Sequence, residues 1–105
     1  MSVIKVTSAD QLNEQINSGK LVIVDFFATW CGPCKRIAPE IETLAGEETG
    51  VVFMKIDVDE LETVAAKYEV SAMPTFLFFK NGAKVAEVVG ASMKNIKEKL
   101  NQLKQ

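Results

Sequence analysis

The sequence contains no histidine and only two cysteines among its 105 residues. Without histidine, neither a Ser-His-Asp triad nor a Cys-His pair can form. Zinc, copper, haem and non-haem iron sites that use histidine ligands are excluded for the same reason. Two cysteines cannot complete a four-cysteine metal site within one chain, and they cannot hold together a disulfide-dense secreted scaffold. We therefore predict a protein without a bound metal.

The sequence also lacks long hydrophobic runs and an excess of positive charge. No stretch approaches the roughly 18 apolar residues of a membrane-spanning helix, and the run 21–28 is interrupted by Asp25. The net charge of −2 provides no basic field for nucleic acids. The first residues, 1–5, contain no hydrophobic block of the kind found in signal peptides. These absences predict a cytoplasmic protein that binds neither nucleic acids nor membranes.

What is present is an ordinary globular composition in a chain of domain size. Hydrophobic residues make up 48% of the chain and charged residues 25%. A chain of this length buries about 65% of its unfolded surface on folding, which is enough for one core and not for two. No repeat, linker or low-complexity segment divides it. We therefore expect a single domain over residues 1–105, and we expect it to be a monomer.

Hydrophobic patterns predict strands that alternate with helices. The run 21–27 is almost continuously apolar and rich in β-branched residues, which is typical of a strand buried on both faces of a sheet. Asn81-Gly82 is a strong signal for a hairpin turn. The predicted order, β-α-β-α-β-α-β-β-α, indicates an α/β fold in which helices cover both faces of a mixed five-stranded sheet. The predicted strands are 3–6, 21–27, 51–58, 75–79 and 84–89.

Side chains with capping-box spacing predict where two helices begin. Ser8 stands three residues before Gln11, and Asp59 stands three residues before Glu62. The longest predicted helix begins close to residue 31, and Pro39 inside it should produce a kink.

The two cysteines, Cys31 and Cys34, follow the predicted buried strand at a spacing of three. In sheets of this type, sites gather beyond the carboxyl ends of central strands. A cysteine at the start of a helix faces free backbone N–H groups and the positive end of the helix dipole, which favour the reactive thiolate. The spacing puts Cys34 on the same side of the first turn, where its sulfur can attack a mixed disulfide at Cys31. Pro33 suits this turn and stiffens the dithiol.

A C-x-x-C pair can also be half of a zinc knuckle. That alternative requires a second pair of cysteine or histidine ligands, and the sequence has none. The position of the pair between a strand and a helix is typical of a redox motif. We therefore interpret Cys31 and Cys34 as a redox-active dithiol.

The segment 24–35, with the sequence VDFFATWCGPCK, closely resembles the thioredoxin family. The resemblance extends over the whole chain, because Pro39, Met73-Pro74-Thr75, Gly82 and Gly90 stand where the family has them. One departure is Phe27, where many bacterial thioredoxins carry a second tryptophan. The departure does not affect the cysteines.

This resemblance implies the thioredoxin fold and a thiol–disulfide oxidoreductase that reduces protein disulfides generally. Cys31 would be the nucleophile and Cys34 the resolving cysteine, with Gly32 and Pro33 tuning their reactivity. The dithiol would be regenerated by thioredoxin reductase and NADPH, so that no cofactor is bound. The implied clients include peroxiredoxins, methionine sulfoxide reductase and ribonucleotide reductase.

Asp25 and Lys55 each place a charge inside an apolar strand. Burial of an unpaired carboxylate is costly, so we expect the pKa of Asp25 to be raised. Asp25 could accept hydrogen bonds from the backbone, but the family resemblance implies a general acid/base that acts on Cys34 through water. Lys55 either extends to solvent or, if the two strands are neighbours, tunes Asp25.

The resemblance also implies a surface for docking clients. It implies a cis peptide bond before Pro74, which would turn the backbone of Met73 toward the cysteines to pair with an extended client segment. Trp30 could instead belong to the core, and Gly90 could serve only as a turn. The implied surface consists of Trp30, Gly32, Pro33, Met73, Pro74, Gly90 and Ala91.

Two other functions use the same residues. The first is a disulfide oxidase or isomerase, which more often carries a histidine between its cysteines. The second is a binding subunit that holds partners through the Trp30–Pro74–Gly90 surface, with redox chemistry secondary.

Overall fold

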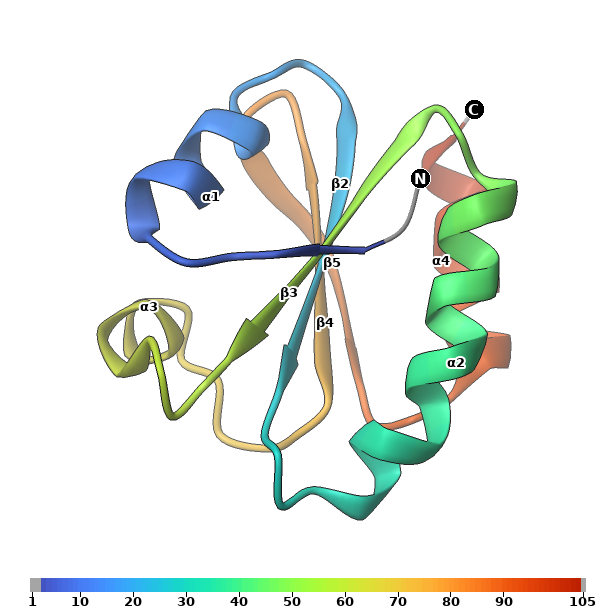
Figure 1. The fold of residues 1–105 in the computed structure, drawn as a ribbon. Coiled ribbons are helices and arrows are strands. Elements are labelled where there is room, and N and C mark those ends of the chain that lie inside the picture. Colours follow the sequence, from blue (N-terminus) through green and yellow to red (C-terminus); the bar gives the residue numbers. More distant parts are fainter. Residues whose placement is uncertain (1–2, 105) are drawn as a thin grey trace.

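The computed structural model describes residues 3–104 and contains nine helices and strands in the predicted order (Figure 1). Each predicted strand is present, with ends that differ by at most one residue. The elements are β1 (Ile4–Lys5), α1 (Ala9–Ile16), β2 (Leu21–Phe27), α2 (Gly32–Glu47), β3 (Val51–Asp57), α3 (Glu62–Lys67), β4 (Thr75–Lys80), β5 (Ala83–Val89) and α4 (Met93–Leu103).

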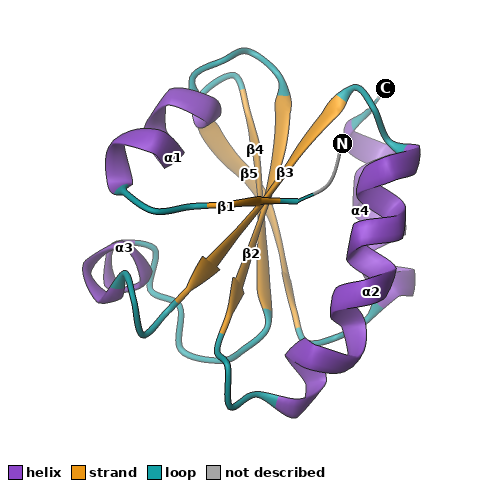
Figure 2. Ribbon diagram, viewed as in Figure 1, coloured by secondary structure: helices purple, strands orange, loops and turns teal. Residues whose placement is uncertain are grey.

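The strands form one mixed sheet in the order β1-β3-β2-β4-β5. β1 and β2 both run parallel to β3, whereas β4 runs antiparallel to its neighbours β2 and β5. Figure 2 shows α1 and α3 on one face of the sheet and α2 and α4 on the other. The prediction of a five-stranded mixed sheet between two helical layers is therefore confirmed.

Each face of the sheet has its own hydrophobic core. Because side chains alternate along a strand, β2 sends Val22 and Val24 into one core and Ile23 into the other. The first core lies under α1 and α3 and includes Leu12, Ile16, Val64 and Ala65. The second lies under α2 and α4 and includes Ile37, Ile41, Leu44, Ile96 and Leu100.

The first helix begins as its capping pattern predicts. The Ser8 hydroxyl accepts a hydrogen bond from the backbone N–H of Gln11 at 3.2 Å. Ser92 caps α4 in the same way, with a bond of 3.1 Å from the N–H of Asn95. Both bonds satisfy N–H groups that a helix leaves without partners in its first turn.

The predicted capping role of Asp59 is wrong. Helix α3 begins at Glu62 with Leu61 in the N-cap position and no side-chain cap. The chain instead makes a turn, in which the N–H groups of Glu60 and Leu61 both donate to the carbonyl of Asp57 at 3.1 Å. Asp59 therefore lies three residues before the first residue of α3, and its carboxylate accepts a hydrogen bond from Trp30 instead of capping the helix.

The hairpin between β4 and β5 turns at Asn81 and Gly82, as predicted. Both residues have left-handed backbone angles, with φ of 55° and 83°. A two-residue turn of this kind matches the twist of the flanking strands. A Cβ atom at Gly82 would also lie 3.0 Å from the side-chain oxygen of Asn17, so the turn demands glycine on two grounds.

We predict that Gly82→Ala lowers the free energy of unfolding by about 1–2 kcal/mol, the cost of placing an L-residue in the left-handed region. Gly50→Ala is the matched control, because its Cβ would meet nothing within 4 Å and its φ lies outside that region. The control should stay within about 0.5 kcal/mol of the wild type in urea unfolding. Equal losses in both variants would contradict this account of the turn.

Candidate active site

Cys31 and Cys34 lie where the chain leaves β2 and enters α2, at the lower edge of the sheet in Figure 1. They form a disulfide, with their Cα atoms 5.3 Å apart. Cys31 is the N-cap residue of α2, and both cysteines are 5% exposed. The predicted position at a strand-to-helix junction is confirmed.

The sulfur of Cys31 faces the N-terminus of α2. It accepts a hydrogen bond from the backbone N–H of Cys34 at 3.2 Å. Pro33 occupies the first turn, where its missing N–H leaves no bond unmade. When the disulfide is reduced, the same N–H and the helix dipole stabilise negative charge on Cys31.

Asp25 lies near the end of β2 on the face covered by α2, since it alternates in phase with Ile23. One of its carboxylate oxygens, Oδ1, is buried with no hydrogen-bond partner among residues 3–104. Burial raises the pKa of Asp25 to about 7, and the positive charge of Lys55 offsets part of this rise. Lys55 is the register partner of Asp25 on β3, so the two strands are neighbours and their side chains share a face.

A pocket of about 230 Å³ connects Asp25 with Cys34. Both residues line it, together with Lys55 and Lys35. The pocket has room for water molecules, and the orphaned carboxylate oxygen and the lysines supply polar partners for them. The arrangement can therefore carry a proton between Cys34 and Asp25 through water.

The segment 73–74 reaches the cysteines from the start of β4. The Met73–Pro74 peptide bond is cis, and the Met73 carbonyl oxygen lies 3.7 Å from the sulfur of Cys31. In the disulfide form this is a van der Waals contact and not a hydrogen bond, because the Cys31 sulfur carries no hydrogen. The N–H of Gly90 donates to the Pro74 carbonyl at 2.8 Å, which ties the end of β5 to the same place. Of the implied docking residues, Gly32 and Ala91 are exposed and Pro74 is buried.

Trp30 lies on the surface and not in the core, with 66% of its area exposed. Its indole N–H donates to the Asp59 carboxylate at 2.9 Å. The sequence interpretation missed this role of Asp59 by assigning it to a helix cap. A signal was available, because Asp59 follows a strand parallel to the one before Trp30, so both loops leave the same edge of the sheet.

Residues 3–104 contain no helix that is long and apolar enough to cross a membrane. The same part of the chain brings together no group of three or more side chains able to ligate a metal.

The fold and the buried dithiol define a thiol–disulfide oxidoreductase. The thioredoxin family model matches residues 3–102. Thioredoxin-1 of Saccharomyces cerevisiae is 54% identical over 96 residues, which cover 91% of this chain and 93% of the relative. The chain belongs to the thioredoxin family and has the protein disulfide reductase activity of that family.

Solved structures agree with this assignment. The X-ray structure of Fasciola hepatica thioredoxin superposes with a TM-score of 0.92 at 46% identity, covering 95% of this chain and 98% of that one. A chain from a study of thiol resolution in yeast mitochondrial 1-Cys peroxiredoxin via glutathione/thioredoxin systems superposes with a TM-score of 0.91 at 34% identity. That match covers 96% of this chain and 95% of the other.

We predict that Asp25→Asn changes how stability depends on pH. The carboxyl of Asp25 has a pKa of about 7 in the folded protein, against 3.8 for an unperturbed aspartate such as that of the unfolded chain. Between these pH values the folded protein holds a proton that the unfolded chain has lost, so wild-type stability falls as pH rises. A pKa difference of this size corresponds to about 4 kcal/mol.

Asparagine at position 25 cannot ionise, so the stability of the variant does not fall in this way as the pH rises. Its stability relative to the wild type should therefore rise by up to about 4 kcal/mol between pH 4 and 8, measured by urea unfolding of the disulfide forms. Asp10→Asn, on the exposed first turn of α1, is the control for the substitution itself. A constant stability difference between Asp25→Asn and the wild type across this range would disprove the buried ionisation.

Proposed function

We propose that this chain is a general reductant of protein disulfides, acting as a single domain over residues 1–105, as a monomer and in the cytoplasm. The observation that carries the proposal is the Cys31–Cys34 disulfide at the N-terminus of α2, beside a pocket that Asp25 also lines. Thiolate formation, resolution and proton transfer would all take place within this one site.

The proposed reaction begins when the Cys31 thiolate attacks a client disulfide. A bond forms between Cys31 and one client sulfur, and the second client sulfur leaves as a thiolate that takes up a proton. Cys34 then attacks the Cys31 sulfur, and the first client sulfur leaves as a thiolate that also takes up a proton. The client disulfide gains two electrons, and the Cys31–Cys34 disulfide is formed. Asp25 takes the proton of Cys34 through water in the pocket, and Lys55 tunes the pKa of Asp25.

Clients would dock on the mostly apolar surface around Cys31. The backbone of Met73 would pair with an extended client segment, in the manner of an added strand. Gly32 and Pro33 would tune the reactivity of the sulfur. The proposed docking residues are Trp30, Gly32, Pro33, Met73, Gly90 and Ala91. Pro74 is buried and would support this surface from below.

Regeneration of the dithiol requires an electron donor. We propose thioredoxin reductase, which draws its electrons from NADPH, so that this chain uses NADPH only indirectly. The two sulfurs carry both electrons and no cofactor needs to be bound. The proposed clients are peroxiredoxins, methionine sulfoxide reductase and ribonucleotide reductase. A role toward peroxiredoxins is supported by the similar chain from the study of peroxiredoxin thiol resolution.

We predict that Cys34→Ser traps the mixed disulfide, because no second sulfur remains to resolve it. Incubation with a peroxiredoxin in its disulfide form should accumulate a covalent complex that is visible on a non-reducing gel and lost on addition of dithiothreitol. Cys31→Ser is the matched control and should form far less complex. Equal amounts of complex from both variants would contradict the assigned order of attack.

The reduction potential of the Cys31–Cys34 pair separates a reductant from an oxidase or isomerase. We expect a value near about −270 mV, the value known for thioredoxin itself, in equilibrium with defined thiol–disulfide buffers. A value between about −180 and −120 mV would instead indicate a protein that donates or rearranges disulfides. A double variant, Cys31→Ser with Cys34→Ser, that kept full biological activity would indicate a binding subunit.

A further inference from the structure

The indole of Trp30 is held by one hydrogen bond at its edge, and most of the residue is exposed. Its N–H donates to Oδ2 of Asp59 at 2.9 Å, while two thirds of the residue is exposed. A solvent-exposed aromatic side chain without a polar partner samples several rotamers, and ordering it costs conformational entropy on binding. A hydrogen bond at the indole edge removes part of this freedom before any client arrives and leaves the ring faces available.

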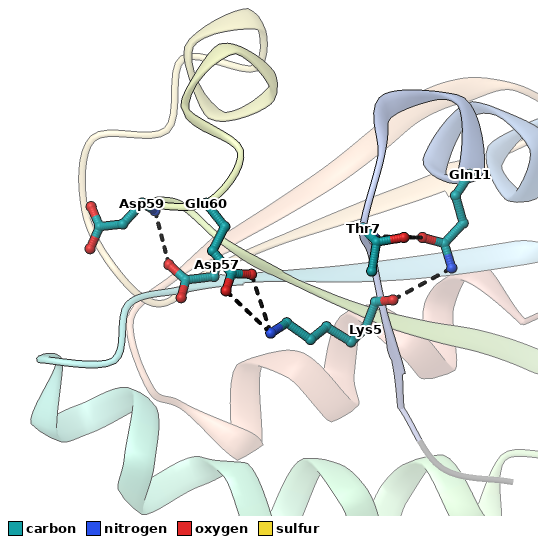
Figure 3. Close-up of polar contacts among 6 residues, drawn as sticks. All are labelled: Lys5, Thr7, Gln11, Asp57, Asp59 and Glu60. Carbon is teal, nitrogen blue, oxygen red and sulfur yellow. Dashed lines mark hydrogen bonds and ion pairs between the residues drawn. The ribbon is translucent and has the colours of Figure 1, made fainter.

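Asp59 is itself fixed by the end of β3. Its backbone N–H donates to Oδ1 of Asp57 at 2.9 Å, and Asp57 is a buried residue paired in register with Phe27 of β2. Figure 3 shows the Asp59 carboxylate directed away from Asp57. The next residue, Glu60, forms an ion pair with Lys5 at 3.2 Å and so anchors the other side of the same turn (Figure 3).

The turn that carries Asp59 is also tied to the strand that leads to Trp30. The N–H of Val58 donates to the carbonyl of Phe27 at 2.9 Å, directly before the loop 28–31. The hydrogen bond from Trp30 to Asp59 thus closes a bridge between two loops that leave the same edge of the sheet. Neither Trp30 nor Asp59 forms a hydrogen bond with the Cys31 sulfur. That sulfur contacts the Met73 carbonyl and accepts from the Cys34 N–H.

We propose that Asp59 is a positioning residue that holds the Trp30 indole in the orientation in which protein clients dock. The inference rests on the proposed function, because it requires that clients contact Trp30. Asp59 acts through Trp30 and not on the sulfurs. Its loss weakens the binding of protein clients and leaves the redox equilibrium of the dithiol unchanged.

The test compares substitutions at Asp59 with a neighbouring acid. Asp59→Ala removes the acceptor, whereas Asp59→Asn keeps an acceptor oxygen and removes the charge. Glu60→Gln is the matched control. It also removes one negative charge, but Glu60 is the next residue along the chain and pairs with Lys5, not with Trp30. Trp30→Phe keeps a ring and removes the N–H, and the double variant with Asp59→Ala completes a cycle.

Reduction of insulin, with dithiothreitol regenerating the dithiol, supplies kcat and KM. We expect Asp59→Ala to raise KM about threefold to tenfold, the range for loss of one exposed hydrogen bond, with kcat within about twofold of the wild type. Asp59→Asn should recover part of the loss and Glu60→Gln should show none. Trp30→Phe should raise KM as well, and adding Asp59→Ala to it should cause little further change.

The chain has one tryptophan, so its fluorescence reports on Trp30 alone. Asp59→Ala should lower the fluorescence anisotropy, Asp59→Asn should partly restore it, and the reduction potential should be unchanged in both. An unchanged KM in Asp59→Ala overturns the inference while leaving the proposed function intact. So does a further rise in KM when Asp59→Ala is added to Trp30→Phe, if that rise equals the effect of Asp59→Ala alone. Failure of the wild type to reduce insulin overturns both.

Discussion

The enclosure of β2 on both faces and along both edges is the constraint on which the site depends. β3 and β4 hydrogen-bond to its edges, and a hydrophobic core packs on each face. A strand held in this way cannot shift its register without moving apolar side chains out of a core. The end of β2 is therefore fixed, and with it the start of α2 and the position of Cys31. The same enclosure buries Asp25.

Two electrostatic effects of opposite sense meet within this small region. The N-terminus of α2 favours negative charge on the Cys31 sulfur, because the Cys34 N–H donates to it and the positive end of the helix dipole faces it. Burial disfavours negative charge on Asp25 and raises its pKa to about 7. One site thus combines a sulfur suited to attack with a carboxyl whose pKa lies near neutrality, where it can both accept and release a proton. Lys55 moderates the second effect without removing it.

The sequence was sufficient to predict the fold, the dithiol and the raised pKa of Asp25, because these depend on local patterns. Alternation and β-branching identified the buried strands, and Asn81-Gly82 identified the hairpin. Capping spacing was less reliable. It predicted the start of α1 at Ser8 and failed at Asp59, because the same side chain types form turns and hydrogen bonds to distant partners.

The contacts that complete the site join residues far apart in the sequence. The register of β2 on β3 brings Asp25 beside Lys55. The sequence could predict this contact only on the condition that the two strands are neighbours. The hydrogen bond from Trp30 to Asp59 crosses between two loops, and no local pattern contains both residues. The approach of Met73 to Cys31 came from the family resemblance and not from the physical chemistry of the segment.

β5 is an outer strand of the sheet, and its shape makes this open edge a poor place for another strand to pair. The pairing of β5 with β4 shifts register at Phe78 and Phe79, so that Val85 has no counterpart on β4. Lys84 and Glu87 flank this bulge with charge, paired at 3.4 Å. Bulges and charges of this kind hinder a further strand from joining an open edge. The irregular and charged edge at β5 therefore disfavours extension of the sheet by a sixth strand on this side.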